Sequence, residues 1–272
     1  MSTTPGGTQH VISRLMRESL VDRGVIAATE APVRPILPHL NVIQIGGLPI
    51  MDRGQSAVLP LLDEIIANQA QHTQVVGVGP GVRARHILSV GLDLGLPTGA
   101  LATLSAKSAA QNAYMVSCLL ASHGFVYLEA PFIVQLLPAM LAAARGAVFN
   151  GVPPYDLWEH PPALGKIPPH GSDAGSYLVG EVFGARSVIL LKDVDGVYTA
   201  DPKRDPSARL LPEVNAAALL ADMPETLPIE PMLLELLTRA KTVKSVRLVN
   251  GLVPGNLTRA LAGEPVGTLI RG

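Results

Sequence analysis

Apolar residues recur along most of the chain with two alternating spacings, one typical of strands and the other of helices. The stretches LNVIQI (40–45) and TQVVGVG (73–79) are almost continuously apolar, as in strands that are buried on both faces. Between them, the segment 54–71 carries apolar residues at helical spacing: Val58, Leu61, Leu62, Ile65 and Ile66. This alternation predicts an α/β fold with a mainly parallel sheet that helices cover on both faces.

The alternation continues through the rest of the chain. It predicts further strands over 125–131, 146–151, 187–191, 245–251 and 266–270. It predicts further helices over 81–95, 100–124, 132–144, 173–185, 231–242 and 255–264. Residues 151–172 interrupt the pattern, because the six prolines in that span exclude regular helix and central strand. Long irregular loops in compact domains are often functional.

The chain begins with a segment that stands apart from the alternating elements. Residues 1–9 have the composition of a disordered segment, and residues 10–23 (HVISRLMRESLVDR) have the apolar spacing of a helix. Prolines separate this helix from the first strand. We therefore expect an N-terminal arm over 1–38, packed on a neighbouring subunit or on the main domain, and one domain over 39–272.

Charge and cysteine content narrow the classes of function. A net charge of −1 gives no support for a surface that binds nucleic acid or a membrane. The single cysteine, Cys118, excludes a disulfide scaffold and fits a reducing cytoplasm. No signal peptide is expected, and no uninterrupted apolar run reaches the roughly 18 residues of a membrane span.

The low charge also bears on assembly. Charged residues make up 16% of the chain, and its mean hydropathy is +0.33. Lone domains usually carry more charge, so these values favour a surface that other subunits partly cover. A large apolar core is the alternative explanation.

Glycine turns follow three of the predicted strands. Gly46–Gly47 ends the first strand, the second runs into GVGPGVRAR (77–85), and the strand over 245–251 runs into NGLVPGN (250–256). The residues of interest in that second turn are Gly79, Pro80 and Gly81. In an open parallel sheet, ligands lie at the carboxyl ends of the strands, where backbone N–H groups of such turns bind anions, and Arg83 and Arg85 add positive charge. Ordinary strand–helix turns are the alternative, since the chain has neither a GxxxxGKS/T loop nor a GxGxxG fingerprint.

An aspartate-rich turn, KDVDGVYTADP (192–202), follows a later strand. Its Asp195-Gly196 pair resembles the turn of a β-hairpin. A calcium site is the alternative, although the EF-hand spacing and its closing glutamate are absent.

A few side chains elsewhere are candidates for ligand contact. His160 and His170 lie in the proline-rich loop, and Glu129 ends a predicted strand on the face where ligands gather. Solvated histidines and a surface or helix-capping role for Glu129 are the alternatives. The sequence predicts neither a preformed zinc site nor a Ser-His-Asp triad, because no HxH, HExxH or Cys/His cluster and no triad signature occurs.

Three stretches resemble the amino acid kinase family, in its UMP-kinase-like branch. They are VIQIGG (42–47), GSDAGSYLVGEVFGARSVILLKDVDGVYTADPK (171–203) and VRLVNGLVPGNLTRALAGEPVGTLI (246–270). Within that branch, the chain closely resembles the family of molybdenum storage proteins. The arm helix and SVGLDLGLP (89–97) resemble the alpha subunits of that family, whereas PPYDLW (153–158) and KDVDG (192–196) resemble its beta subunits.

The resemblance implies a three-layer αβα sandwich, the amino acid kinase fold, with a site for ATP and Mg²⁺. The phosphates of ATP are expected over the first two glycine turns, and the nucleoside end near Lys192, Tyr198 and Asp201. It assigns no catalytic residue. The residues that the resemblance assigns to nucleotide binding are Gln44, Gly46, Gly47, Gly79, Pro80, Gly81, Arg85, Asp173, Lys192, Asp193, Tyr198, Asp201 and Lys203.

The storage-protein resemblance implies more. It implies a hexameric cage, a trimer of dimers, that takes up molybdate or tungstate with ATP and encloses polynuclear oxide clusters. Glu129, His160 and His170 are the metal-binding residues expected on this basis. The chain departs from the family at Ala130 and Met140, where cluster-binding histidines are expected and where these side chains offer no ligand for oxygen-rich metal species. Absent or altered clusters, clusters held by a related second subunit, and a homomeric cage all stay open.

Gln44 is the departure that bears on catalysis, because family members usually have a lysine there that meets the nucleotide phosphates. Glutamine donates a hydrogen bond but does not neutralise the charge of a transferred phosphate. The sequence therefore predicts a nucleotide site with weak or absent hydrolysis.

Two other functions stay open. One is a UMP-type kinase, although the chain has no acidic residue between Asp93 and Glu129, where such kinases place an aspartate that meets the UMP ribose. The other is a non-catalytic nucleotide-binding subunit whose role is assembly.

Overall fold

The computed structural model describes residues 32–153, 159, 162–202, 204–224 and 227–272. The chain divides into two compact units, 1–34 and 35–272, and the description below concerns the second. The helix predicted over 10–23 and most of the predicted arm lie outside the described residues. None of the described helices is long and apolar enough to cross a membrane.

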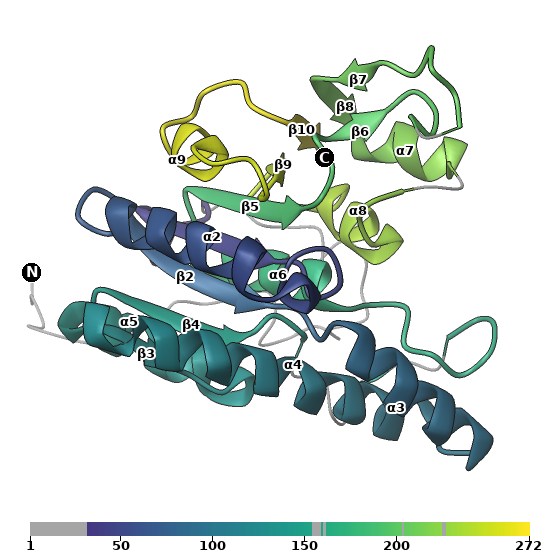
Figure 1. Ribbon diagram of the computed structural model, residues 1–272, viewed down its shortest axis with the longest axis horizontal. Helices are drawn as coiled ribbons and strands as arrows, with labels where there is room; N and C mark the ends of the chain where they lie inside the picture. Colours follow the sequence, from purple (N-terminus) through teal and green to yellow (C-terminus); the bar gives the residue numbers. More distant parts are fainter. Residues whose placement is uncertain (1–31, 154–158, 160–161, 203, 225–226) are drawn as a thin grey trace, which may run out of the picture. The chain divides into compact units, whose positions relative to one another are not determined.

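An eight-stranded sheet forms the centre of this unit, with the order β3-β4-β2-β1-β5-β9-β10-β8 (Figure 1). Every neighbouring pair is parallel except β9 and β10, which confirms the predicted mainly parallel sheet. All six residues of β1 are buried, which explains its apolar sequence. The strands are β1 Leu40–Ile45, β2 Thr73–Val78, β3 Phe125–Tyr127, β4 Gly146–Asn150, β5 Ser187–Lys192, β8 Glu213–Asn215, β9 Ser245–Asn250 and β10 Thr268–Arg271.

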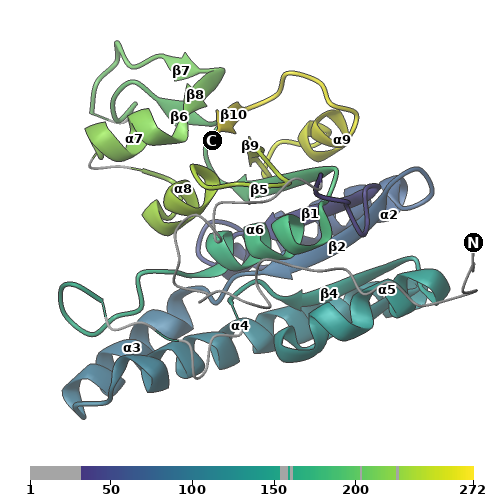
Figure 2. The ribbon, with the colours of Figure 1, turned by 180° about the vertical axis from the view of Figure 1, so that it is seen from behind.

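Helices cover both faces of the sheet, so the unit is a three-layer αβα sandwich, as predicted (Figure 1 and Figure 2). One apolar core joins the face of Val42 to α5, α6, α7 and α8, and a second joins the face of Ile43 to α2, α4 and α9. The α-helices are α2 Gln55–Asn68, α3 Val82–Asp93, α4 Thr98–Leu120, α5 Ile133–Ala143, α6 Ser172–Phe183, α7 Ala216–Asp222, α8 Pro231–Leu237 and α9 Asn256–Leu261. Short 3-10 helices cover Met51–Arg53, Ala121–His123 and Ala130–Phe132.

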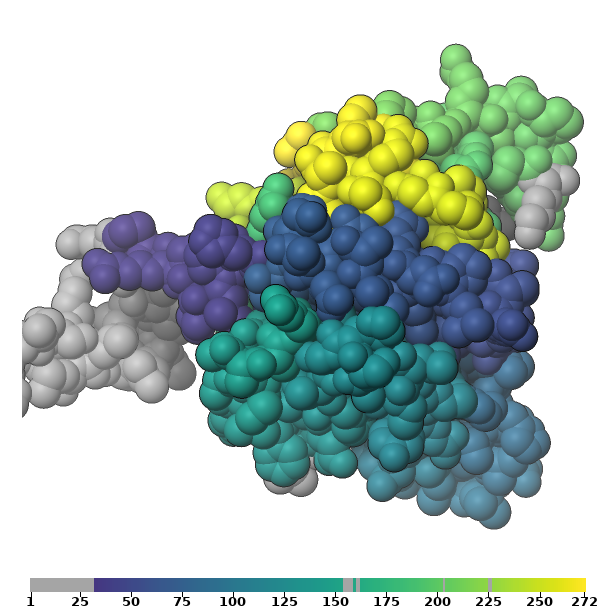
Figure 3. All heavy atoms as spheres, turned by 60° about the vertical axis from the view of Figure 1, so that its left-hand side comes forward, coloured from purple at the N-terminus to yellow at the C-terminus, as the bar shows by residue number. Residues whose placement is uncertain are grey.

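The last helix, α9, lies beside α2 on the same face of the sheet (Figure 3). The carboxylate of Glu64 in α2 accepts hydrogen bonds from the N–H groups of Gly255 (3.3 Å) and Thr258 (2.6 Å) at the start of α9. Side-chain oxygens commonly satisfy the unpaired N–H groups of a helix N-terminus in this way. The contact fixes the chain that leaves β9 against α2.

The structure corrects the prediction in the region after β5. The strands β6 (Val197–Tyr198) and β7 (Leu210–Leu211) pair as an antiparallel ribbon, so Asp195-Gly196 precedes the ribbon and does not form its turn. The elements β7, β8 and α7 were not predicted. The two strands span two and three residues and carry exposed side chains, so they leave no periodic apolar signal.

Five strands end at one edge of the sheet, because β4, β2, β1, β5 and β9 are parallel neighbours. Backbone hydrogen bonds extend the sheet just past these ends: Gly46 donates to Leu191 (3.1 Å) and Gly79 donates to Ile45 (2.9 Å). The two glycine turns therefore leave adjacent strands at the same level.

Candidate functional site

The first two predicted glycine turns lie in direct backbone contact at this edge of the sheet. A Cβ atom built on Gly47 would lie 2.2 Å from the nitrogen of Gly81 and 2.8 Å from the carbonyl carbon of Gly79. A Cβ atom on Gly79 would lie 2.7 Å from the nitrogen of Gly47. Because the crowded atoms belong to the backbone, neither position accepts a side chain without moving the turns apart. The N–H groups of Gly46 and Gly79 are taken by the sheet, so any anion must bind farther along each turn.

A cavity of about 850 Å³ opens over these turns, and we call it the central cavity. The structure brings most of the predicted nucleotide-binding residues into its wall. From the two turns come Gly47, Pro80 and Gly81, and from the elements around them come Arg85, Asp173, Lys192 and Asp193. The wall also contains Arg53, Ser172 and the segment from Leu227 to Pro231, which the sequence did not indicate.

Two ion pairs and one hydrogen bond order the charged groups of the central cavity. The Nζ atom of Lys192 lies 2.7 Å and 2.8 Å from the carboxylate oxygens of Asp173. The guanidinium of Arg53 lies 2.6 Å from Asp193. The Asp52 carboxylate accepts a 2.6 Å hydrogen bond from the N–H group of Val82, the first residue of α3. Positive and negative groups therefore share the cavity.

Gln44 is not part of this wall. Its side chain is fully buried, its Nε2 atom donates a 2.9 Å hydrogen bond to the carbonyl of Ile45, and its Oε1 atom accepts one from the hydroxyl of Ser176 in α6. Both ends of the amide are thus satisfied inside the domain. Since Gln44 lies beneath the turns, the structure does not bring it together with the predicted nucleotide-binding residues that line the cavity.

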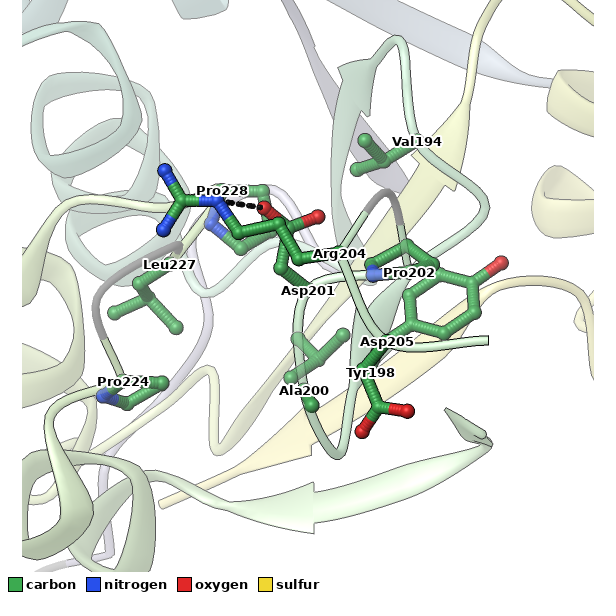
Figure 4. Close-up of a pocket in the computed structure, with 12 residues that line it drawn as sticks. Val194, Tyr198, Ala200, Asp201, Pro202, Arg204, Asp205, Pro224, Leu227 and Pro228 are labelled. Atoms are coloured by element: carbon green, nitrogen blue, oxygen red, sulfur yellow. Dashed lines mark ion pairs between the residues drawn. The ribbon is translucent and has the colours of Figure 1, made fainter. Parts of the chain in front are cut away.

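A second cavity, of about 510 Å³, adjoins the central cavity and is named the side cavity here (Figure 4). It shares Leu227 and Pro228 with the central cavity and holds two more predicted residues, Tyr198 and Asp201. The carboxylate of Asp201 lies 3.7 Å from the guanidinium of Arg204. Burial and the neighbouring Asp195 carboxylate raise the pKa of Tyr198, so its hydroxyl stays protonated at neutral pH.

A third cavity, of about 530 Å³, lies where β3 and β4 end, and Glu129 contributes to its wall. Lys107 of α4 and Asn150 at the end of β4 line it as well. Asn150 is 8% exposed, and its Oδ1 atom has no hydrogen-bond partner among the described residues. Burial and the charge of Glu129 raise the pKa of Tyr127 in the same wall. We call this space the Glu129 cavity.

His170, another predicted metal-binding residue, does not line this cavity. The Nε2 atom of His170 lies 2.9 Å and 2.8 Å from the two carboxylate oxygens of Glu159, and both side chains are buried. His160 and Lys203 lie outside the described residues. Within the part of the chain that the structure describes, no three His, Cys, Asp or Glu side chains are placed to hold a metal ion.

Glu230 is a buried charged residue of the site that sequence reasoning missed. It lies in the wall of the central cavity, and its carboxylate accepts hydrogen bonds from the N–H groups of Gly171, Asp173 and Ala174 at the start of α6. Burial is the main cause that raises the pKa of Glu230 to about 7, and the neighbouring Asp173 carboxylate adds to it. No motif contains Glu230; its position just before Pro231, at the start of a helix, is the one local signal.

Comparison with protein families and curated proteins gives consistent matches. The model of the amino acid kinase family matches residues 39–250. The molybdenum storage protein subunit beta of Azotobacter vinelandii is 46% identical over 257 residues, which cover 94% of this chain and 95% of that protein. A uridylate kinase of Hyperthermus butylicus is 31% identical over 206 residues, or 73% of this chain and 82% of the kinase.

Solved structures with the same fold include two kinases. The uridylate kinase of Archaeoglobus fulgidus gives a TM-score of 0.67 at 24% identity, over 85% of this chain and 99% of the kinase. The UMP kinase of Bacillus anthracis gives a TM-score of 0.65 at 17% identity, over 86% of this chain and 96% of the kinase. At these identities the likeness shows the shared fold.

Proposed function

The chain belongs to the amino acid kinase family, and on that premise we propose that it is a subunit of a molybdate- or tungstate-storing assembly that binds ATP. Its likeness to a storage-protein subunit over nearly its whole length favours this function over kinase activity. The structural observation that carries the proposal is the pair of glycine turns in backbone contact, with the Lys192 ammonium beside them in the same cavity wall.

The residues of the central cavity fit a nucleotide. Gly47 and Gly81 contribute only backbone to the cavity wall, so a phosphate can approach the main chain there. Arg85 and Lys192 supply positive charge from two sides. The side cavity continues past Leu227 and Pro228 and offers a largely apolar wall for the base and ribose.

Magnesium is proposed to arrive with the nucleotide. Mg²⁺ usually keeps several waters and binds through substrate phosphates with one or two carboxylates, so it needs no preformed protein cage. Asp193, in the wall of the central cavity, is the carboxylate that we assign to this role. When bound, the ion neutralises phosphate charge, and the chain's own residues orient the nucleotide.

Hydrolysis of that nucleotide is expected to be slow. Transfer of a phosphoryl group depends largely on positive charge placed around it. Gln44 supplies none and is held by Ser176 and Ile45, while Lys192 is already paired with Asp173. The proposed site therefore binds ATP better than it cleaves it.

The Glu129 cavity is proposed to hold the oxyanion cargo. The ammonium of Lys107 attracts an oxyanion, while Glu129 and the unpaired Oδ1 atom of Asn150 accept hydrogen bonds from protonated cluster oxygens. The Nε2 atom of His170 contacts the Glu159 carboxylate. His170 and His160 are both still proposed to bind the metal oxyanion.

The assembly is proposed to be a cytoplasmic hexameric cage, a trimer of dimers, with or without a related second subunit. Exposed apolar side chains on the outer surfaces of α4 and α5 support subunit contact: Tyr114, Met115, Leu119, Val134 and Leu136. A surface of this kind is unusual on a lone domain. Burial of these large apolar side chains against a neighbouring subunit would stabilise the assembly.

A UMP-type kinase is the second candidate function, because relatives named as uridylate kinases cover most of the chain. The buried Gln44 and the lack of an acidic residue between Asp93 and Glu129 disfavour it.

Elemental analysis and native mass of protein purified after growth with molybdate test the storage function, together with a coupled assay with ATP and UMP. We expect a hexameric mass with more than one metal atom per chain and no UMP phosphorylation; a metal-free protein that phosphorylates UMP would contradict the proposal.

A further inference from the structure

A carboxylate of the chain itself occupies the N-terminus of α6. Glu230 Oε2 accepts hydrogen bonds from the N–H groups of Gly171 (2.8 Å) and Ala174 (3.0 Å), and Oε1 accepts one from the N–H group of Asp173 (3.0 Å). Glu230 directly precedes α8, which lies next to α6 in both ribbon views (Figure 1 and Figure 2). The contact joins two elements that are far apart in the sequence.

The N-terminus of a helix at this edge of the sheet is a place where an anion commonly binds. The N-terminus of α6 lies at the carboxyl edge of the sheet, where free N–H groups and the helix dipole favour negative charge. Glu230 uses three of those N–H groups. A Cβ atom on Gly171 would lie 2.6 Å from Glu230 Oε1, so the carboxylate lies against the backbone and leaves no room for a second anion.

The surrounding charges do not cancel that of Glu230. Asp173 and Lys192 are the charged side chains that act on it, and they bind each other through both carboxylate oxygens. That pair is neutral as a unit. When Glu230 is ionised, the part of the wall at the N-terminus of α6 therefore carries a net negative charge, which the helix dipole partly offsets.

We propose that Glu230 determines which nucleotides the central cavity prefers, by excluding phosphate from the N-terminus of α6. This inference rests on the proposed nucleotide site. The phosphate chain is confined to the glycine turns and Lys192, and each further phosphate group meets more repulsion from Glu230. The nucleoside portion lies in the side cavity and is not affected. Affinity therefore increases less from adenosine to ADP to ATP than it would with an open helix N-terminus.

Calorimetric titration of the full chain at pH 8 with adenosine, ADP and ATP, each with Mg²⁺, tests this proposal. The variants are E230Q and E230A, and the matched controls are E235Q and E235A, because Glu235 is an exposed carboxylate on the same helix. We expect E230Q to bind ATP roughly tenfold more tightly than the wild type, ADP by a smaller factor and adenosine equally well. A change of the same size for all three ligands would mean that Glu230 only caps α6, and it would overturn the proposal.

The design separates this inference from the proposed function. E230A leaves three N–H groups of α6 without a partner and therefore risks unfolding the protein. Glutamine fits the same space as glutamate, so E230Q decides the outcome if E230A does not fold. Wild-type protein that binds ATP, with no phosphate-dependent change in E230Q, contradicts the inference alone. ATP binding by E230Q but not by the wild type supports the inference and contradicts nucleotide binding by the natural chain. Absence of binding in both contradicts both.

Discussion

Lys192 and Asp173 join the end of β5 to the start of α6 through two short contacts, 2.7 Å and 2.8 Å, between the ammonium and the carboxylate oxygens. The Asp173 side chain is 1% exposed and that of Lys192 is 14% exposed. The pair therefore holds the only lysine of the central-cavity wall in place, within the described residues, and it shields a buried carboxylate.

The variant K192M is expected to destabilise the protein by about 3 kcal/mol, because it leaves the buried Asp173 carboxylate without its partner. The double variant K192M/D173N removes both charges and is expected to recover most of that loss. Urea unfolding measures both effects. The control is R259M, which breaks an exposed pair with Glu264 and should cost under about 1 kcal/mol. A double variant no more stable than K192M would contradict this account of the pair.

Restoring a lysine at position 44 is expected to raise the rate of ATP hydrolysis on the order of tenfold or more, because it adds positive charge beneath the glycine turns. The same change should cost about 1–3 kcal/mol of stability, since position 44 is fully buried. A phosphate-release assay measures the rate. Q74K is the matched control, because Gln74 is equally buried but lies at the other end of the neighbouring strand. An unchanged rate in Q44K would count against the hydrolysis hypothesis.

Replacement of Gly47 by alanine is expected to separate the two glycine turns, because the new Cβ atom would meet the backbone of Gly79 and Gly81. We expect a loss of about 1–3 kcal/mol of stability and a weakening of ATP binding by at least about tenfold. Calorimetry and urea unfolding measure the two effects. L59A shortens an exposed side chain of α2 outside the cavity wall and should change neither. Full ATP affinity in G47A would show that the phosphates bind elsewhere.

The stability of the protein is expected to fall as the pH rises from about 4.5 to about 7, through the titration of Glu230. The pKa of this carboxyl is raised from its ordinary value of 4.5 to about 7, so in this window the folded protein binds a proton that the unfolded chain has released. The contribution is fully present below pH 4.5 and is lost above pH 7. Urea unfolding between pH 4 and pH 8 should show a steeper decline for the wild type and E235Q than for E230Q; equal slopes would contradict the shift.

Much of the fold follows from the sequence, because the central strands and the long helices bury complete faces. β1 and β2 are mainly apolar, and α2 repeats its apolar residues at helical spacing, so each of these elements can be recognised from its own stretch of sequence. β7 and β8 are too short to leave such a pattern, and Asp195-Gly196 suggested a hairpin turn that the strand pairing does not use.

The sequence predicted the parts of the candidate site that lie within one short stretch, but not the contacts between distant stretches. Each glycine turn is contained in one stretch and was found, but their mutual contact depends on the packing of β1 against β2. Glu230 acts on residues 56 to 59 positions away, and no local pattern encodes that contact. The burial of Gln44 likewise depends on Ser176, which a different part of the chain supplies.

Retention of molybdenum by the purified protein tests the central claim most directly. The intact assembly is incubated with molybdate, with and without ATP and Mg²⁺, and separated by gel filtration, after which the metal bound per chain is measured. We expect more than one molybdenum atom per chain at the assembly's mass, only when ATP is present, and little in G47A. Metal at trace level in an intact assembly that has bound ATP would contradict storage as the function of this chain.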